Sequence, residues 1–172
     1  MKQLFCSVLI FCAAGSSVAQ DMNAFTPEGD ATYYDFWEGT WYQVVNGEPD
    51  TSSSRFIVRS TVHPAGWYED WYMVIDSATT WTAEAIRAWD KTDNRWMYTW
   101  ISDNGLHQIW EGRKSGDDWY FYRHFDVGGD KYLSRQGWIP LEEDKLMRIS
   151  EKSYDQGETW ELRFREYYMK VE

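Results

Sequence analysis

Ten stretches of alternating side chains, separated by short turns, constrain the fold of this chain more than any other feature. Each stretch is rich in Trp, Tyr, Phe, Val, Ile and Thr, the residues that suit the pleated surface of a β-strand. The stretches are Trp37–Val45, Ser54–Val62, Trp67–Ile75, Trp81–Trp89, Arg95–Ile101, Leu106–Arg113, Asp118–Phe125, Lys131–Ile139, Lys145–Ser153 and Thr159–Tyr168. Gly, Asn, Asp and Pro fill the short connections, and a parallel crossover would need a dozen or more residues. We therefore expect consecutive strands to be antiparallel.

An even number of antiparallel strands allows the last strand to pair with the first, which removes both exposed edges of the sheet. No stretch has a convincing helical period, and no change of composition marks a second domain. We predict an all-β fold, a single antiparallel up-and-down barrel of about ten strands over residues 36–172. Residues 20–35 are expected to form an N-terminal tail with a short helical turn near Ala31–Trp37.

The first 19 residues have the pattern of a secretory signal peptide. Lys2 gives a positive start, Leu4–Ala14 is apolar, and Ser17-Val18-Ala19 offers small residues at a cleavage point. The apolar run is about half of the roughly 20 residues that a membrane-spanning helix needs. We expect cleavage after Ala19, no membrane span, and a periplasmic or secreted mature protein.

Charge and cysteine content exclude several classes of function. The chain has 28 Asp and Glu against 17 Lys and Arg, a net charge of −11. Nucleic-acid binding is not expected, because a protein must present positive charge to a phosphate backbone, and an anionic membrane surface is disfavoured for the same reason. Both cysteines, Cys6 and Cys12, lie in the signal segment, so we expect neither a disulfide nor a thiolate metal site in the mature chain.

The central strands carry aromatic residues on both faces, whereas an ordinary half-buried strand is charged on one face. Either one face lines a cavity of mixed character, or Trp and Tyr pave both sides of the sheet. The alternation leaves open which face is interior. One strand with this weak contrast between its faces is 118–125, where Trp119, Phe121, Arg123 and Phe125 alternate with Tyr120, Tyr122 and His124.

Phe36-Trp37-Glu38-Gly39-Thr40-Trp41 opens the first strand with a Gly-x-Trp motif. With the meander that follows, this motif resembles the calycin superfamily, the lipocalins and fatty-acid-binding proteins. Over residues 33–170 the chain is similar to bacterial lipocalin-like domains of unknown function, which carry a turn like Asp90–Asn94 and a step like Glu111-Gly112. Gly39 allows a sharp bend where the chain enters the barrel, and Trp41 can plug its bottom or serve only as a core residue.

The segment from Ser153 to Trp160 matches the pattern Ser-x-Asp-x-Gly-x-Thr-Trp, the Asp-box of sialidase propellers. A propeller would repeat the pattern at a fixed period, and this chain has a single copy. We interpret it as a hairpin turn in which Asp155 accepts backbone N–H groups, Gly157 supplies a positive φ and Trp160 packs below.

The function that the sequence favours is binding of a small hydrophobic or amphipathic ligand in an aromatic barrel cavity. An arginine inside the barrel can hold a carboxylate through two parallel hydrogen bonds. Arg87, Arg123 and Arg148 are candidates for this role, whereas Arg59 is expected on the outer face. The predicted ligand contacts are Trp41, Trp71, Tyr98, Trp100, Trp110, Tyr120, Tyr122, His124 and Arg148.

Two alternatives stay open at this point. The first is a barrel enzyme, an isomerase or lyase, in which His124 works with a carboxylate such as Glu69 or Glu84. This role requires the face of His124 to be interior. The second is a glycan-binding surface, since exposed Trp and Tyr rings can stack on sugars.

No cofactor and no metal are predicted. His63, His107 and His124 do not have metal-ligand spacing, and the chain lacks phosphate-loop and dinucleotide motifs. Haem-binding barrels related to fatty-acid-binding proteins share a Gly-x-Trp start, but their ligating histidine comes late in the chain, and this sequence has no histidine after His124. The sequence does not predict an oligomeric state.

Overall fold

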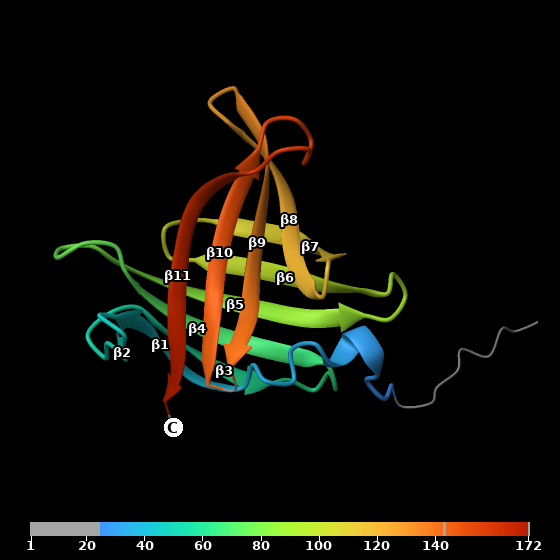
Figure 1. The fold of residues 1–172 in the computed structure, drawn as a ribbon, viewed down its shortest axis with the longest axis horizontal. Coiled ribbons are helices and arrows are strands. Elements are labelled where there is room, and N and C mark those ends of the chain that lie inside the picture. The colour runs from blue at the N-terminus through green and yellow to red at the C-terminus, as the bar shows by residue number, and fades with distance from the viewer. Residues whose placement is uncertain (1–24, 143, 172) are drawn as a thin grey trace, which may run out of the picture.

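The first and last strands of the sheet pair with each other. In the computed structural model, which describes residues 25–142 and 144–171, Thr40 lies opposite Val171 and Trp41 opposite Lys170 in an antiparallel register. Every other strand of the ring pairs with its neighbour in sequence, so ten strands close into an up-and-down barrel (Figure 1). The predicted fold class is confirmed. The predicted signal peptide lies outside the described residues.

The strands correspond closely to the ten alternating stretches. Those of the ring are β1 (Gly39–Val45), β3 (Arg55–Ser60), β4 (Gly66–Val74), β5 (Thr80–Asp90), β6 (Arg95–Ser102), β7 (His107–Ser115), β8 (Asp118–Val127), β9 (Asp130–Glu142), β10 (Lys145–Ser153) and β11 (Glu161–Val171). The two-residue strand β2 (Glu48–Pro49) pairs with Val44 and Val45 at the end of β1 and adds a small hairpin beside the ring. A 3-10 helix, η1 (Gly29–Thr32), precedes the barrel.

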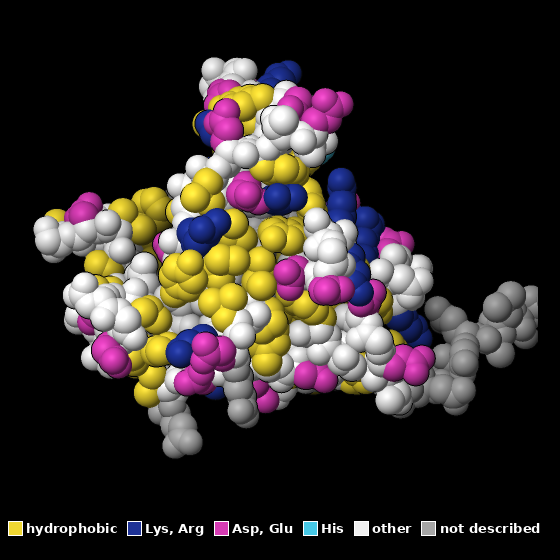
Figure 2. Space-filling model, in the orientation of Figure 1, with side chains coloured by type: hydrophobic (Ala, Val, Ile, Leu, Met, Phe, Trp, Pro, Cys, Tyr) yellow, Lys and Arg dark blue, Asp and Glu magenta, His cyan; other side chains and the backbone are white. Residues whose placement is uncertain are grey.

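The barrel is flattened into two layers that cross each other. In Figure 1, β5, β6 and β7 run across the view, while β9, β10 and β11 run from top to bottom in front of them. Figure 2 shows this front face, where hydrophobic side chains gather at the centre and charged side chains surround them. In the part of the chain that the structure describes, no helix is long and apolar enough to cross a bilayer.

Aromatic rings fill the space between the layers. Phe56 and Trp71 stack with ring centroids 4.1 Å apart, and Trp37 stacks on Phe56 at 5.0 Å. Rings of this size bury much apolar surface, worth about 25 cal/mol per Å² removed from water. A dense aromatic core therefore stabilises the barrel.

The segment around η1 seals one end of the barrel. Trp96 donates its indole N–H to the Asp30 carbonyl at 3.0 Å, and Tyr33 donates its hydroxyl to Asp118 at 2.9 Å. Tyr34 is wholly buried and meets Trp96 edge to face at 4.9 Å. Ala31 and Tyr34, in the stretch expected to be a tail, are thus part of the core, and the 3-10 helix of this segment begins at Gly29, two residues before the expected helical turn.

At the other end the ring is split between two strands. β7 pairs with β8 only from Glu111 to Ser115, as far as the described residues show. Beyond that point β7 stays with β6, and β8 rises with β9 into a projecting hairpin (Figure 1). Arg123 bridges the split by donating from Nη1 to the Ile109 carbonyl at 3.1 Å.

The Asp-box segment is a hairpin turn between β10 and β11. The Asp155 carboxylate accepts hydrogen bonds from the Thr159 backbone N–H at 2.8 Å and from the Thr159 hydroxyl at 2.5 Å. Gly157 has a φ of +100°, and Trp160 packs directly against it. This geometry confirms the structural interpretation of the motif.

Candidate ligand-binding site

A partly open cavity of about 250 Å³ lies at the end of the barrel opposite η1. It is formed where β4, β6 and β10 approach the split between β7 and β8. Its walls combine aromatic rings with a few polar groups, the usual composition of a small-molecule site. The lining residues are Met73, Trp81, Tyr98, Trp100, Ser102, Asn104, Leu106, Gln108, Trp110, Phe125, Tyr132, Gln136, Arg148, Arg163 and Phe164.

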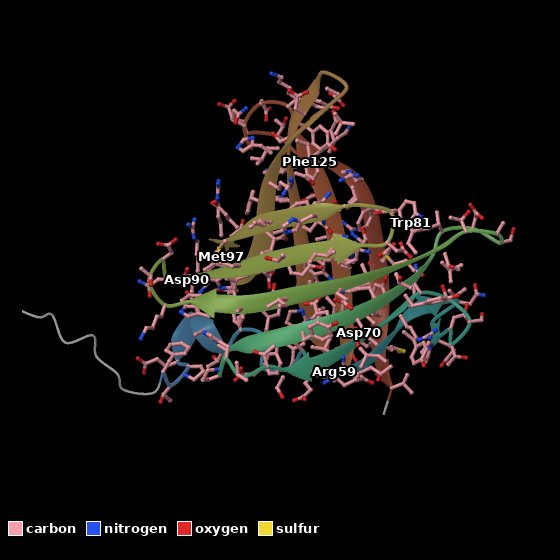
Figure 3. All side chains as sticks on the ribbon, turned by 180° about the vertical axis from the view of Figure 1, so that it is seen from behind. Arg59, Asp70, Trp81, Asp90, Met97 and Phe125 are labelled. Carbon is pink, nitrogen blue, oxygen red and sulfur yellow. The ribbon has the colours of Figure 1, made fainter. Side chains whose placement is uncertain are left out.

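The aromatic wall is continuous across the split. Trp110 on β7 meets Phe125 on β8 with centroids 5.5 Å apart, and Phe125 stacks on Tyr132 of β9 at 5.2 Å. Figure 3 labels two residues of the rim, Phe125 at the base of the projecting hairpin and Trp81 near the start of β5. Side-chain contact thus replaces backbone pairing where β7 and β8 separate.

Arg148 is the main charged group of the cavity. Its Nη1 donates to Glu166 at 2.9 Å, and its Nη2 donates to the Gln136 side-chain oxygen at 3.3 Å. The guanidinium also lies 4.7 Å from the Phe164 ring centroid. Burial is the largest single effect and lowers the pKa of Arg148, but the neighbouring acidic groups, Glu166 first among them, together outweigh it, so the pKa is raised. The arginine is therefore held in place and charged, with its charge balanced by a carboxylate.

A second ion pair lies deeper in the barrel. Arg87 Nε is 2.9 Å from Glu69 Oε1, and neither side chain has any exposed surface. Trp37 and Trp71 donate to the same carboxylate at 3.0 and 2.8 Å. Neither charged residue lines the cavity, so the pair is a structural element of the core.

Aromatic rings enclose the Arg87 guanidinium. Its central carbon is 4.2 Å from the Tyr34 ring, 4.3 Å from Trp37 and 4.5 Å from Trp138. Tyr98, whose ring is 5.2 Å away, also lines the cavity and so lies between the two arginines. Burial raises the pKa of the Tyr98 hydroxyl well above its ordinary value, and this group remains a neutral phenol.

Four of the predicted ligand contacts lie in the cavity wall, namely Tyr98, Trp100, Trp110 and Arg148. Trp71 is buried behind them, 5.6 Å from Trp100. Trp41 lies outside the cavity lining and donates its indole N–H to the Trp37 carbonyl at 2.9 Å. The structure thus separates these inward residues into a cavity group and a core group.

Tyr120, Tyr122 and His124 lie on the outer face of β8. The alternating residues Trp119 and Phe121 are buried, because Trp119 packs on Trp89 and Phe121 packs on Tyr98. The pleat then turns the other set outward, where Tyr122 meets Trp160 at 5.9 Å.

An acid–base role for His124 required its side chain to point into the barrel, and the structure places it on the outer face. His124 is exposed on the outside, whereas Glu69 is sealed inside with both oxygens engaged. Among the described residues, no group of three His, Cys, Asp or Glu side chains is arranged to hold a metal ion.

Several cavity residues were missed at the sequence level. Gln108 and Gln136 could have been found, because they alternate in phase with Trp110 and Trp138. Phe164 was harder to assign, since a bulge between Ser150 and Glu151 shifts the pairing of β10 with β11. Regular alternation would place Trp160 on the same face as Phe164, four residues later. In this irregular region Trp160 lies on the outer face instead, beside Tyr122 and Arg135.

The sequence matches no protein-family model and no curated protein. The closed antiparallel barrel is compatible with a calycin-like architecture at the level of the fold. The assignment of function therefore depends on the cavity itself.

Proposed function

We propose that this protein is an exported, lipocalin-like binding protein for a small apolar or amphipathic molecule. The observation that carries the proposal is the aromatic cavity of about 250 Å³ with Arg148 fixed in its wall. A ligand that enters it removes apolar surface from water, at about 25 cal/mol per Å². The polar side chains then set its orientation.

Export rests on the amino-terminal pattern of Lys2, Leu4–Ala14 and Ser17-Val18-Ala19. Expression of the full chain in a bacterial host tests it. Mass spectrometry of the periplasmic and culture fractions should find a mature protein that begins at Gln20. Retention of the uncleaved chain in the cytoplasm would contradict export.

Filling the cavity tests the binding role. Ser102 is nearly buried in the cavity wall, and the substitution Ser102→Phe places a ring inside. Thr99→Phe is the matched control, because it places the same ring on β6 but outside the cavity lining. Both variants are titrated with a panel of fatty acids, polyphenols and terpenoids while tryptophan emission is recorded.

The wild-type protein and Thr99→Phe should respond to at least one compound, and Ser102→Phe should lose that response. Native mass spectrometry of the exported protein adds an independent test, because a carried ligand should co-purify. No response across the panel together with no co-purifying molecule would overturn the proposal.

The outer face gives less support to the glycan alternative. Stacking on a sugar needs a free ring face, but the Arg135 guanidinium lies 4.0 Å over the Trp160 ring. Arg113 lies 4.9 Å over Tyr122 in the same way. These contacts favour a structural role for the outer rings.

A further inference from the structure

We propose that the cavity selects an uncharged molecule whose oxygen atoms accept hydrogen bonds, such as a ketone or ether on a flat ring system. This inference rests on the proposed function and narrows the ligand class. Some hydrogen-bonding groups of the cavity wall are already bonded to the protein. The groups that remain available to a ligand are mostly donors, and they determine the ligand class.

The two glutamines of the wall both turn their oxygens toward the protein. Gln136 Oε1 accepts from Arg148 Nη2 at 3.3 Å, and Gln108 Oε1 accepts from the Trp110 indole N–H at 3.2 Å. Guanidinium and indole nitrogens can only donate, so these contacts fix the orientation of both amides. Each glutamine is left with its NH₂ group, which is a donor.

The third amide of the wall shows the same arrangement. Asn104 Oδ1 accepts from the Ser102 hydroxyl at 2.6 Å, which leaves the Asn104 NH₂ group. Two further groups are buried without a partner among the described residues, the Tyr98 hydroxyl and Arg148 Nε. A buried polar group without a partner is energetically unfavourable, so a ligand acceptor atom that reaches either group gains a hydrogen bond. The polar lining is therefore rich in donors.

The charge balance at Arg148 argues against a carboxylate deep in the cavity, and the second arginine of the lining, Arg163, is exposed to solvent. Glu166 already neutralises Arg148 and accepts a second hydrogen bond from the Tyr168 hydroxyl at 3.2 Å. A ligand carboxylate at Arg148 would lie beside the Glu166 carboxylate and would lose its own hydration. A neutral acceptor can bind the donors without either penalty, and a cation finds few free acceptors.

The size and shape of the cavity favour a flat ligand. A dry cavity of about 150 Å³ already holds a benzene molecule, so about 250 Å³ has room for two fused rings. Trp100, Trp110 and Phe125 offer ring surfaces for such a frame. A naphthalene scaffold is thus a suitable probe.

Four naphthalenes that differ in one group test the inference by calorimetry on the mature protein. They are 2-acetylnaphthalene, 2-ethylnaphthalene, 2-naphthoate and 2-naphthylmethylammonium. We expect the ketone to bind about tenfold more tightly than the ethyl compound, and more tightly than either ion, as one net hydrogen bond provides.

Gln136→Glu and Gln108→Glu are nearly isosteric tests of the donor role. Each carboxylate still accepts from Arg148 or Trp110, but the NH₂ donor is gone. These variants should lose the preference for the ketone and gain affinity for the ammonium compound. Gln43→Glu is the control, because Gln43 accepts from Ser53 at 2.9 Å and is not part of the cavity lining.

The outcomes separate the two proposals. If none of the four compounds binds, this inference fails, while the proposed function is decided separately by the wider ligand panel and by co-purification. If 2-ethylnaphthalene or 2-naphthoate binds as tightly as the ketone, or if both glutamate variants behave like Gln43→Glu, the binding role stands and the acceptor preference is overturned.

Discussion

Glu69 and Arg87 form an ion pair with no exposed surface, and their Oε1 and Nε atoms are 2.9 Å apart. Taking two charges out of water is expensive, and their attraction offsets this only when the remaining hydrogen bonds are made. Two indole N–H groups complete the Glu69 carboxylate, whereas Arg87 Nη1 and Nη2 have no hydrogen-bond partner among the described residues and lie against aromatic rings instead. We therefore expect that removing one partner alone lowers the stability of the fold, because the other charge is left buried without compensation.

Glu69→Gln should destabilise the fold strongly, because it leaves the Arg87 charge buried and uncompensated. We expect a loss of about 3–5 kcal/mol in the free energy of unfolding, measured by urea denaturation. Asp70→Asn is the control from the next position in the chain. It breaks the exposed ion pair with Arg59, whose atoms are 2.6 Å apart (Figure 3), and should cost at most about 1 kcal/mol. Equal losses in the two variants would contradict the assigned role of the buried pair.

A comparison of two buried tryptophans, Trp37 and Trp138, can measure how much an indole hydrogen bond adds to stability beyond the packing of the ring. Trp37 donates to Glu69 at 3.0 Å, whereas the Trp138 N–H is buried with no partner within the described chain. Trp37→Phe and Trp138→Phe remove similar ring volume, but only the first removes a hydrogen bond to a charged group. Trp37→Phe should therefore be about 1.5–3 kcal/mol more destabilising in thermal or urea unfolding. A Trp138→Phe variant that is the less stable of the two would argue against this account.

Gly112 is required by the close approach of β6 to β7. A Cβ atom at this position would lie 2.5 Å from the Trp96 backbone carbonyl, which cannot move without disturbing the sheet. Gly112→Ala should cost about 1–3 kcal/mol, as overpacking of a core does. Gly137→Ala is the comparison, because its Cβ would meet the Tyr120 ring at 2.9 Å, and that half-buried ring can turn aside. Chemical denaturation should rank Gly137→Ala as the more stable variant.

Asp155 should contribute to stability in a pH-dependent manner. Hydrogen bonds from the Thr159 hydroxyl and backbone N–H, together with one from Ser153, hold the pKa of Asp155 well below its ordinary value. Because the folded pKa is depressed, the contribution is complete at neutral pH and is lost in acid, below about pH 5, as the carboxylate takes up a proton.

Asp155→Asn tests this linkage. The variant should be less stable than the wild-type protein at pH 7, and the difference should shrink as the pH falls toward 3. Asp117→Asn, which removes the same charge from an exposed position, is the control for the change in net charge. A constant difference between Asp155→Asn and the wild-type protein across this range would rule the linkage out.

Turn chemistry and alternation were sufficient to predict the ten strands of the ring. They could not assign the faces of β8, because Tyr120 and Tyr122 are as suited to a core as Trp119 and Phe121. The choice is made by tertiary packing, since Tyr34 stacks on Phe121 at 6.2 Å from a segment expected to be a tail.

Arg87 and Glu69 were each noted from the sequence, but not as partners. They lie on adjacent strands without being directly opposite, since Glu69 faces Ala85 across the ladder and Arg87 faces Trp67. The cavity group was predicted in part, because Trp100 and Trp110 have the inward phase of their strands. The amide orientations that define its donor character depend on contacts between strands, such as that of Gln136 with Arg148.

The pairing of β1 with β11 also determines when the native state can form. These strands lie near opposite ends of the described chain, so the contacts with the greatest sequence separation are the ones that complete the ring. Folding slows as contacts become less local. Until β11 is available, strand β1 has a free edge of the kind that promotes self-association, so the rate at which the chain emerges and the supply of chaperones should govern the yield of folded protein.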